Sequence, residues 1–290
     1  MCGLTGFWQS PGIDPDASRE LVLRMAQRIA HRGPDDHGAW VDGSAGVALG
    51  HRRLSILELS AAGHQPMASA SGRYVIAFNG EIYNHTALRA QLPQQPWRGH
   101  SDTETLLAGI EQWGFEATLR KAVGMFAIAL WDRERRRLTL ARDRFGEKPL
   151  YVARLQGATL FASELKAFDA WPGFAPPIDR GAVALLLRHN YIPAPYSISE
   201  GVSKLPPATL LHLDGPTQVG SPQPYWSLRD VAEQGQREPF SGTGAEATDA
   251  LEGHLDAAIA LQRVADVPLG AFLSGGVDSS VVVALMQRQS

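Results

Sequence analysis

The sequence predicts an α+β fold in two parts, a large first domain built on an antiparallel sheet and the beginning of an α/β unit. In the first part, short apolar runs recur about every ten residues with turn-forming residues between them, which is typical of antiparallel strands. A few amphipathic helical stretches accompany them, so sheet and helices are expected to pack in layers. Near the C-terminal end, an apolar run, a glycine-rich turn and a helical stretch indicate an α/β unit. The length of 290 residues suggests about two domains.

Two helices of the first part begin with capping residues. Asp14-Pro15 predicts an N-cap and a first helical residue, and apolar residues four apart continue that helix to about Ala30. Ser101 and Glu104 have the spacing of a capping box, in which each side chain bonds a backbone amide of the other residue. The helix that follows is expected to stop at Gly114.

The strands of the first part are expected where apolar runs are bounded by glycine or polar residues. Met125–Trp131 is continuously apolar, which predicts a strand that is buried on both faces. The other expected strands are Val47–Leu49, Tyr74–Phe78, Leu138–Ala141, Leu150–Ala153 and Thr159–Ala162.

The composition changes after the last of these strands. Residues 171–224 are dense in proline, which favours turns and extended connections over long regular elements. Residues 231–244 are polar and contain glycine, which is typical of a linker. We therefore expect a first domain at residues 1–210, a linker at 211–244 and the start of a second domain at 245–290.

The second part is expected to contain a helix, a strand and a further helix. An apolar stripe with a spacing of four residues runs from Leu251 to Ile259 and predicts the first helix. Val267–Leu273 predicts a buried strand, the turn Ser274–Ser280 follows it, and the next helix is expected from Val281.

Composition and charge exclude several classes of protein. Hydrophobic residues make up 44% and charged residues 20%, which argues against disorder. The formal net charge of −3 gives no basic field for nucleic acid. Apolar runs stay shorter than the ~18 residues of a membrane span, and the N-terminus does not resemble a secretory signal. A single cysteine cannot form an intrachain disulfide, so we expect a cytoplasmic protein. From the charge and the short apolar runs, we expect it to bind neither nucleic acid nor membrane.

The single cysteine, Cys2, follows the initiator methionine directly. Because cysteine is small, we expect Met1 to be removed and Cys2 to carry a free α-amine. A terminal amine has a pKa of ~7.7–8.0 and can act as general base for a nucleophile on its own residue. By position alone, an incidental N-terminal residue is the simpler interpretation.

Cys2-Gly3 is the first of five short segments, and the others follow as His31–Asp35, His51–Ser55, Asn79–His85 and Ser101–Asp102. This series resembles the class II glutamine amidotransferase domain of the glutamine-hydrolysing asparagine synthetase family, and the resemblance covers essentially the whole chain. It implies the fold of an N-terminal-nucleophile hydrolase, an antiparallel-sheet sandwich with helices. It also implies that the second part is the start of an α/β domain of the ATP-pyrophosphatase type.

The resemblance implies a role for each residue of a glutaminase site. Cys2 corresponds to the nucleophile that attacks the side-chain amide of glutamine, and Asn79 with the backbone N–H of Gly80 corresponds to the oxyanion hole. Arg53 corresponds to the group that binds the glutamine carboxylate, a task that suits a bidentate guanidinium. Asp102 and Glu81 correspond to the groups that bind the glutamine ammonium. The implied glutamine-binding residues are Arg53, Leu54, Ser55, Ile56, Leu57, Asn79, Gly80, Glu81 and Asp102.

Taken singly, these residues have simpler interpretations. Asn79-Gly80 alone is typical of a type I′ hairpin turn, and Arg53 alone of a surface arginine. Asp102 alone fits the first turn of a helix, where the helix dipole favours an acid. The histidines lack a metal-binding pair four residues apart and no second cysteine is present, so no metal site is expected here.

The loop Ser274–Ser280 presents successive backbone amides and hydroxyls at the start of a helix, which is an anion-binding arrangement. It lacks the lysine of a Walker A loop, and alone it also fits an ordinary strand-to-helix turn. It resembles the pyrophosphate loop of the ATP-pyrophosphatases, which implies ATP as a substrate with Mg²⁺ near Asp278. The implied nucleotide-binding residues are Leu273, Ser274, Gly275, Gly276, Asp278 and Ser279.

The two implied sites describe one reaction. Glutamine is hydrolysed to glutamate and ammonia at Cys2, and the ammonia aminates an aspartate that ATP has activated. Synthetase domains of the family extend well beyond such a loop, so we expect this chain to hold the glutaminase portion and an incomplete synthetase portion. An amidotransferase of the same layout with another carboxylate acceptor and a stand-alone glutaminase subunit remain alternatives. The intact site residues disfavour a non-catalytic module, and the resemblance is compatible with a homodimer.

Overall fold

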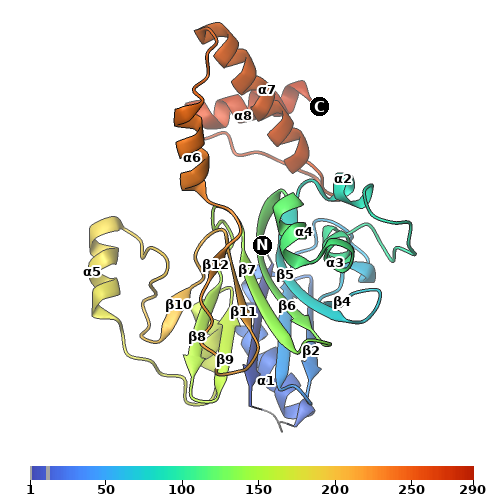
Figure 1. Cartoon of the computed structure of the whole chain (residues 1–290), viewed down its shortest axis with the longest axis vertical. Helices are drawn as coiled ribbons and strands as arrows, with labels where there is room; N and C mark the ends of the chain where they lie inside the picture. The colour runs from blue at the N-terminus through green and yellow to red at the C-terminus, as the bar shows by residue number, and fades with distance from the viewer. Residues whose placement is uncertain (1, 11–13) are drawn as a thin grey trace. The chain divides into compact units, whose positions relative to one another are not determined.

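The computed structural model describes residues 2–10 and 14–290, and the chain divides into two compact units, Met1–Trp226 and Ser227–Ser290. Figure 1 shows the strands gathered in the first unit and three long C-terminal helices in the second. The structure therefore has the α+β composition that the sequence predicts, with sheets in the first unit only among the described residues.

The first unit contains two six-stranded sheets in which all neighbouring strands are antiparallel. The first sheet has the order β10 (Val202–Lys204), β8 (Tyr151–Leu155), β9 (Ala158–Ala162), β1 (Gly3–Gln9), β3 (Val47–Arg53) and β2 (Asp36–Asp42). The second has the order β12 (Gln223–Pro224), β11 (Thr209–Leu213), β7 (Arg137–Arg142), β6 (Gly124–Asp132), β5 (Tyr74–Ile82) and β4 (Met67–Ala68). The strands expected in the first part all form, while their separation into two sheets was beyond the periodicity of the sequence.

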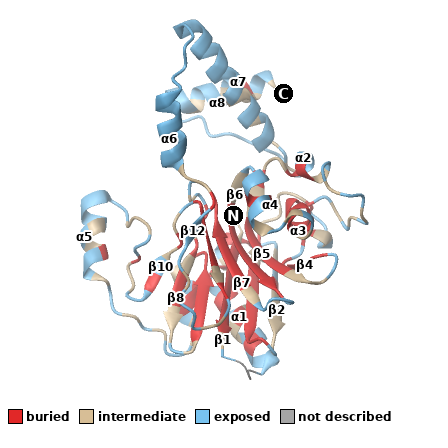
Figure 2. Ribbon diagram, in the orientation of Figure 1, coloured by how far each residue is buried: buried red, intermediate tan, exposed pale blue. Residues whose placement is uncertain are grey.

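The two sheets pack face to face because alternate residues of their strands are apolar. Leu4 and Trp8 on β1 belong to one buried cluster with Val75 on β5 and Trp131 on β6. The rings of Trp8 and Trp131 meet edge to face, with centroids 5.1 Å apart. Figure 2 shows the buried residues concentrated on these central strands. This sandwich is the core of the first unit.

Helices cover the outer face of each sheet. Helix α1 (Pro15–Arg28) packs Val22 and Met25 against Phe7 of β1, and Asp14 is its N-cap as expected. Helix α3 (Asp102–Trp113) packs Leu106 against the second sheet. The unit therefore has four layers, helix, sheet, sheet and helix. The remaining helices of this unit are α2 (His85–Arg89), α4 (Phe115–Lys121) and α5 (Arg180–His189), with short 3₁₀ turns at Ala30–Arg32, Ala61–Gly63 and Leu165–Ala170.

The N-terminus of α3 differs from its prediction in one detail. The Ser101 hydroxyl accepts the Glu104 N–H at 3.2 Å, as a capping serine should, and Gly114 ends the helix with a φ of 86°. The Glu104 carboxylate, however, accepts the N–H groups of Arg98 and Gly99 instead of that of Ser101. The predicted capping box is therefore only half formed, because the preceding loop folds back and presents its own amides to Glu104.

The segment between the two parts is more ordered than its composition indicates. Residue 210, the predicted end of the first domain, lies inside β11, whose leucines pair with β7. The predicted linker at 211–244 contains β12 and helix α6 (Leu228–Arg237), which begins at a capping Ser227. The division of the chain falls instead after Trp226.

The second unit also contains α7 (Gly244–Gln262) and α8 (Val277–Arg288), and Arg288 of α8 forms ion pairs with Glu252 and Asp256 of α7. The strand predicted at Val267–Leu273 is wrong, since this segment has an irregular backbone. A strand needs a hydrogen-bonded neighbour, and no described segment pairs with it. No helix in the described part of the chain is long and apolar enough to cross a membrane.

Candidate active site

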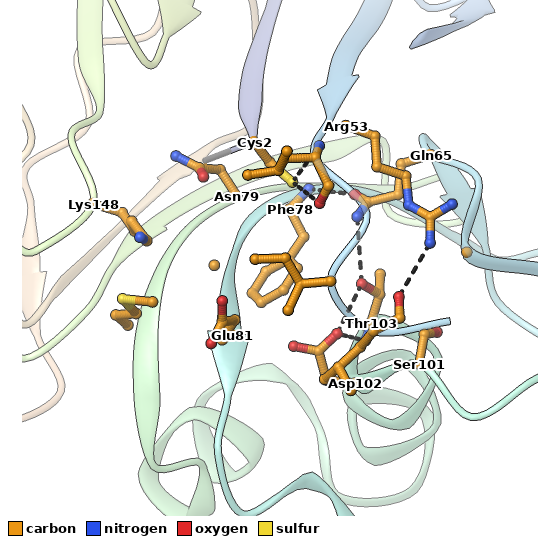
Figure 3. Close-up of a pocket in the computed structure, with 16 residues that line it drawn as sticks. Cys2, Arg53, Gln65, Phe78, Asn79, Glu81, Ser101, Asp102, Thr103 and Lys148 are labelled. Atoms are coloured by element: carbon orange, nitrogen blue, oxygen red, sulfur yellow. Dashed lines mark hydrogen bonds between the residues drawn. The ribbon is translucent and has the colours of Figure 1, made fainter. Parts of the chain in front are cut away.

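One cavity of the first unit brings together most of the residues that the sequence singles out. It opens where the start of β1 and the end of β3 meet the C-terminal half of β5 and the start of α3 (Figure 3). Its lining consists of Cys2, Arg53, Leu54, Ile56, Leu57, Gly63, Gln65, Phe78, Asn79, Gly80, Glu81, Ser101, Asp102, Thr103, Met125 and Lys148. Ser55 is the one predicted glutamine-binding residue outside this lining, and its N–H donates to Asp35 at 2.8 Å.

Cys2 lies immediately before β1 and is half-buried. Its Sγ lies 3.4 Å from the N–H nitrogen of Leu54 and 3.5 Å from the carbonyl oxygen of the same residue. Burial raises the pKa of the thiol, because a thiolate loses hydration there, although the bond with Leu54 acts in the opposite direction. Cys2 therefore needs a base to remove its proton. The predicted removal of Met1, which would free an amine for this purpose, falls on a residue outside the described part.

The backbone of Cys2 is held by Arg32, which belongs to the segment His31–Asp35 but has no role implied by the resemblance. Arg32 donates from Nε to the Cys2 carbonyl oxygen at 2.8 Å and from Nη1 to Glu164 Oε1 at 2.8 Å. Burial opposes ionisation of Glu164, but hydrogen bonds from Arg32, His31 and Lys166 lower the pKa of this carboxyl to about 2. Glu164 is therefore a permanent anion at neutral pH, and it fixes the guanidinium that contacts Cys2.

Asn79 and Gly80 lie in the middle of β5, opposite Ala127 and Phe126 of β6. The hairpin-turn interpretation of this pair is therefore wrong. A Cβ at Gly80 would collide with the carbonyl oxygen of Met125, so only glycine lets the two strands approach here.

The ladder of β5 directs the N–H of Gly80 toward the cavity edge. The N–H and C=O of Phe126 both bond to Asp143 on the other side of β6, so Phe126 and Gly80 form a pair without hydrogen bonds to each other. The amides of Phe78 and Ile82, two residues to either side, face the same edge. Side-chain oxygens of Gln65 and Asp102 accept them at 2.7 and 2.9 Å. Gly80 lies between Phe78 and Ile82 in the strand, so its N–H faces the same edge as theirs.

Arg53 ends β3 and folds its guanidinium over the turn that follows. Nη1 donates to the carbonyl oxygen of Ser60 at 3.2 Å, and Nη2 donates to those of Leu57 at 3.2 Å and Glu58. The side chain is buried, so the surface-arginine interpretation is wrong. Gly63 makes room for it, since a Cβ there would collide with the guanidinium.

Besides Arg53, the charged residues of the cavity lining are two acids and one lysine. Asp102 is buried and accepts N–H groups of Ile82 and Thr103, yet burial is the larger effect and raises its pKa. Burial also raises the pKa of Glu81, and the nearby charge of Asp102 raises it further. Lys148 is buried in the same lining, and burial lowers its pKa although Glu81 acts in the opposite direction. A neighbouring pair of carboxylates is suited to an ammonium group.

Two further residues tie the cavity walls together: Gln65, which no pattern in the sequence singles out, and His51, which opens the segment His51–Ser55 without an implied role. Gln65 accepts the Phe78 amide and donates to Thr103 Oγ1 at 3.3 Å, which links β5 to α3. His51 on β3 bonds from Nε2 to the Phe78 carbonyl oxygen at 2.9 Å, which links the two sheets. Burial lowers the pKa of His51 to about 4, so it serves as a neutral structural group.

The loop before α8 is compatible with binding phosphate. Gly275 has a φ of +83°, and Gly276 caps the helix without a side-chain hydrogen bond to its first amides. The hydroxyls of Ser279 and Ser280 bond instead to the carbonyl oxygen of Gly276, at 3.1 and 2.8 Å. The first amides of α8 therefore stay available to an anion such as a phosphate oxygen of ATP. Leu273 and Asp278 lie exposed on either side of this turn. In the described residues, no group of three or more His, Cys, Asp or Glu side chains could hold a metal ion.

Comparison with known proteins agrees with the two parts of the chain. Residues 1–226 match the sequence profile of the glutamine amidotransferase domain, and residues 250–290 match that of asparagine synthase. A putative glutamine-hydrolysing asparagine synthetase of Mycobacterium tuberculosis is 37% identical over 100% of this chain and 46% of its own length. Asparagine synthetase 3 of Bacillus subtilis is 34% identical over 98% of this chain and 45% of its own length. The chain spans about half the length of these curated relatives.

Among further relatives, amidase chry2 of Gibberella zeae is 35% identical over 99% of this chain and 43% of its own length. Among solved structures, the glutamine phosphoribosylpyrophosphate amidotransferase of B. subtilis is 18% identical, with a TM-score of 0.57 over 78% of this chain and 49% of that chain. At this identity the likeness concerns the fold, and it confirms the predicted antiparallel-sheet sandwich of the amidotransferases.

Proposed function

The chain belongs to the glutamine amidotransferase domain family, and from this we propose that its cavity hydrolyses glutamine to glutamate and ammonia. The observation that carries the proposal is the convergence of Cys2, Arg53, Gly80 and Asp102 on one cavity, although they come from the residue before β1, from β3, from β5 and from α3. A nucleophile, an oxyanion donor, a cation and an anion are the groups that an amino-acid amide requires.

In the proposed reaction, the α-amine of a processed Cys2 takes the thiol proton, and the sulfur attacks the side-chain carbonyl carbon of glutamine. The oxygen becomes an oxyanion that the N–H of Gly80 and the amide of Asn79 stabilise. The carbon–nitrogen bond then breaks, and the amine returns the proton so that ammonia leaves a glutamyl thioester. Water, deprotonated by the same amine, attacks the thioester, which releases glutamate and restores the thiol.

Substrate orientation follows from the charges of the cavity. We propose that Asp102 and Glu81 receive the glutamine ammonium, and that Arg53 receives the carboxylate. The guanidinium of Arg53 is already positioned by three carbonyl oxygens of the 57–60 turn, so binding can use its remaining donor edge without ordering a flexible side chain. Leu54, Ile56 and Leu57 complete the wall beside the substrate.

We also propose that the chain is the N-terminal portion of an asparagine synthetase in which this ammonia aminates aspartate. The match of residues 250–290 and the names of the relatives support aspartate over another carboxylate acceptor. The amides at the start of α8, with Ser274, Gly275, Gly276 and Ser279, would hold ATP phosphates, and Asp278 would contribute to Mg²⁺ binding. ATP would supply activation of the acceptor carboxylate as an acyl-adenylate. A cytoplasmic location and a homodimer stay predictions.

Ammonia release tests the glutaminase proposal. The chain is expected to release ammonia and glutamate in equal amounts from glutamine and to leave asparagine, which is one methylene shorter, nearly untouched. A Cys2→Ala chain is the matched control and should release neither product. Mass spectrometry of the intact chain should show the loss of Met1. A processed, folded chain that releases no ammonia at millimolar glutamine would refute the proposal.

A further inference from the structure

Ser163 connects β1, the strand that directly follows the proposed nucleophile Cys2, with β5, the strand that carries the proposed oxyanion donors. It follows β9 directly and is fully buried. Its backbone N–H donates to the Leu4 carbonyl oxygen at 2.9 Å, and its Oγ accepts the Leu4 N–H at 3.0 Å. The same Oγ lies 3.5 Å from Nδ2 of Asn79. Ser163 therefore contacts β1 two residues after Cys2 and, across the sandwich, the side chain of Asn79.

The hydrogen bonds around this contact are incomplete in the orientation that the structure gives to the Asn79 amide. Asn79 is almost completely buried, and its Oδ1 has no hydrogen-bond partner. Ser163 Oγ accepts twice, from Leu4 and from Asn79, and no described group accepts its own hydroxyl hydrogen. One buried acceptor and one buried donor are thus left unused beside each other, which costs free energy.

A half-turn of the Asn79 side-chain amide would pair the unused acceptor, Asn79 Oδ1, with the unused donor, the Ser163 hydroxyl. The amide oxygen and nitrogen are almost equal in shape, so rotation about Cβ–Cγ exchanges them with little change in packing. The Ser163 hydroxyl can then donate to Oδ1 while still accepting the Leu4 N–H. In Figure 3 the Asn79 nitrogen lies on the far side of its side chain from the Cys2 sulfur. After the half-turn the nitrogen takes the position of the oxygen, on the side of the cavity.

We propose that Ser163 is a positioning residue for the oxyanion hole: its hydroxyl donates to Asn79 Oδ1 and so directs Nδ2 toward the substrate oxygen. The inference rests on the proposed glutaminase function and adds the group that selects the reactive amide orientation. Without that hydroxyl, the hydrogen bond that favours the donor-presenting orientation of the Asn79 amide is lost. Ser163 itself does not touch the substrate.

A double-mutant cycle separates this role from a merely structural one. Ser163→Ala is expected to lower kcat for glutamine hydrolysis roughly 10- to 100-fold, since a misdirected donor loses much of what an oxyanion donor contributes, and to leave KM within about twofold. In an Asn79→Ala background, Ser163→Ala is expected to change kcat by less than about twofold. If Ser163 acted only by holding Leu4 and Cys2, its full effect would persist in that background, and the proposal would be overturned.

The chain offers a matched control for the loss of a buried hydroxyl. Thr5 is fully buried on β1, and its Oγ1 donates to the Phe161 carbonyl oxygen at 3.2 Å, away from Asn79. Thr5→Val should leave kcat within about twofold of the parent value. Where Ser163→Ala lowers the yield of folded chain, Ser163→Cys keeps a weaker donor of similar size, and the same cycle applies with a smaller loss of kcat.

Carbon NMR of the side-chain carbonyl of Asn79 gives a readout that does not depend on catalysis. In the full chain labelled at asparagine Cγ, the Asn79 resonance is identified by its loss in Asn79→Ala. Ser163→Ala should move it upfield, because the carbonyl loses a hydrogen bond, and Thr5→Val should not. If Ser163→Ala leaves the chemical shift of Asn79 Cγ unchanged, the inference is overturned even in an active enzyme. A parent chain without glutaminase activity, but with this shift, would refute the proposed function alone.

Discussion

The guanidinium of Arg32 donates to the carbonyl oxygen of Cys2 at 2.8 Å, and this bond fixes the backbone of the proposed nucleophile from a residue 30 positions away. The same side chain binds Glu164, whose carboxylate stays ionised because its pKa lies at about 2. Arg32 is buried, so its geometry is set by these two partners and not by solvent. The position of the Cys2 sulfur thus depends on an ion pair.

Replacement of Arg32 by lysine should therefore damage catalysis more than stability. A lysine keeps the charge but cannot bond two acceptors in the fixed fork of a guanidinium, so Cys2 loses its backbone anchor or Glu164 loses its partner. We expect kcat for glutamine hydrolysis to fall about 10- to 100-fold, as small misplacements of reacting groups do. Steady-state ammonia release measures this directly.

The control for this substitution is Arg24→Lys on α1. Arg24 pairs with Glu20 one helical turn away at 2.7 Å, and both side chains are exposed. Exposed pairs of this kind contribute little to stability, so kcat and the melting temperature should stay at the parent values. Equal losses in the two variants would show that the link between Arg32 and Cys2 has no catalytic role.

Glu81→Gln should stabilise the empty protein and weaken glutamine binding. Burial and the charge of Asp102 both raise the pKa of Glu81, so its ionised form is unfavourable in the empty cavity. Removal of the charge should raise the melting temperature by roughly 1–3 °C. The same change removes an anion that would face the substrate ammonium, so KM for glutamine should rise about tenfold or more. Thermal unfolding and kinetics on the same samples check both halves. A lower melting temperature would contradict the account.

The pH dependence of stability follows with a definite sign. A carboxyl whose pKa is raised in the folded state binds protons more tightly there than in the unfolded chain. Glu81 therefore makes the free energy of unfolding decrease as pH rises from its ordinary pKa of 4.5 through its raised value. Affinity for glutamine should change in the opposite direction, since binding needs the ionised form. The difference between parent and Glu81→Gln unfolding curves isolates this contribution. A difference that does not vary with pH in this range would refute it.

Gly80→Ala should destabilise the first unit. Its Cβ would collide with the backbone of Met125 and Phe126, which cannot move without disturbing the β5–β6 ladder. We expect a loss of about 1–3 kcal/mol in the free energy of unfolding, together with a large loss of kcat. Gly215→Ala is the control, because nothing lies within 4 Å of a Cβ there. Chemical denaturation of both variants gives the comparison, and equal stabilities would contradict the close strand approach.

Local patterns were sufficient to predict about half of the helices and strands in the described part of this fold. Asp14 and Ser101 mark helix starts through hydrogen bonds to neighbours in sequence, and the apolar run around Met125 needs only a buried strand to explain it. The two-sheet arrangement depends instead on contacts between distant segments, such as Trp8 with Trp131. The strand expected at Val267–Leu273 failed for the same reason, since pairing partners decide whether an apolar run becomes a strand.

The same distinction between local patterns and long-range contacts applies to the candidate site. Short motifs pointed to Cys2 and Asn79-Gly80, and the cavity brings them together. Gln65, Lys148 and the link from Arg32 to Cys2 carry no signal in their spacing, because each acts through a contact formed only by the folded chain. Hydrogen-bond partners that lie on different strands are not visible in a single sequence.

The central claim, that Cys2 is the nucleophile of this cavity, is tested most directly by trapping the acyl-enzyme. The chain is mixed with glutamine, quenched in acid during turnover and analysed by mass spectrometry. We predict one glutamyl group per chain, located on the N-terminal peptide that contains Cys2 and absent from Cys2→Ala. A Cys2→Ala chain that still releases ammonia at the parent rate, with no adduct on the parent Cys2, would contradict the account.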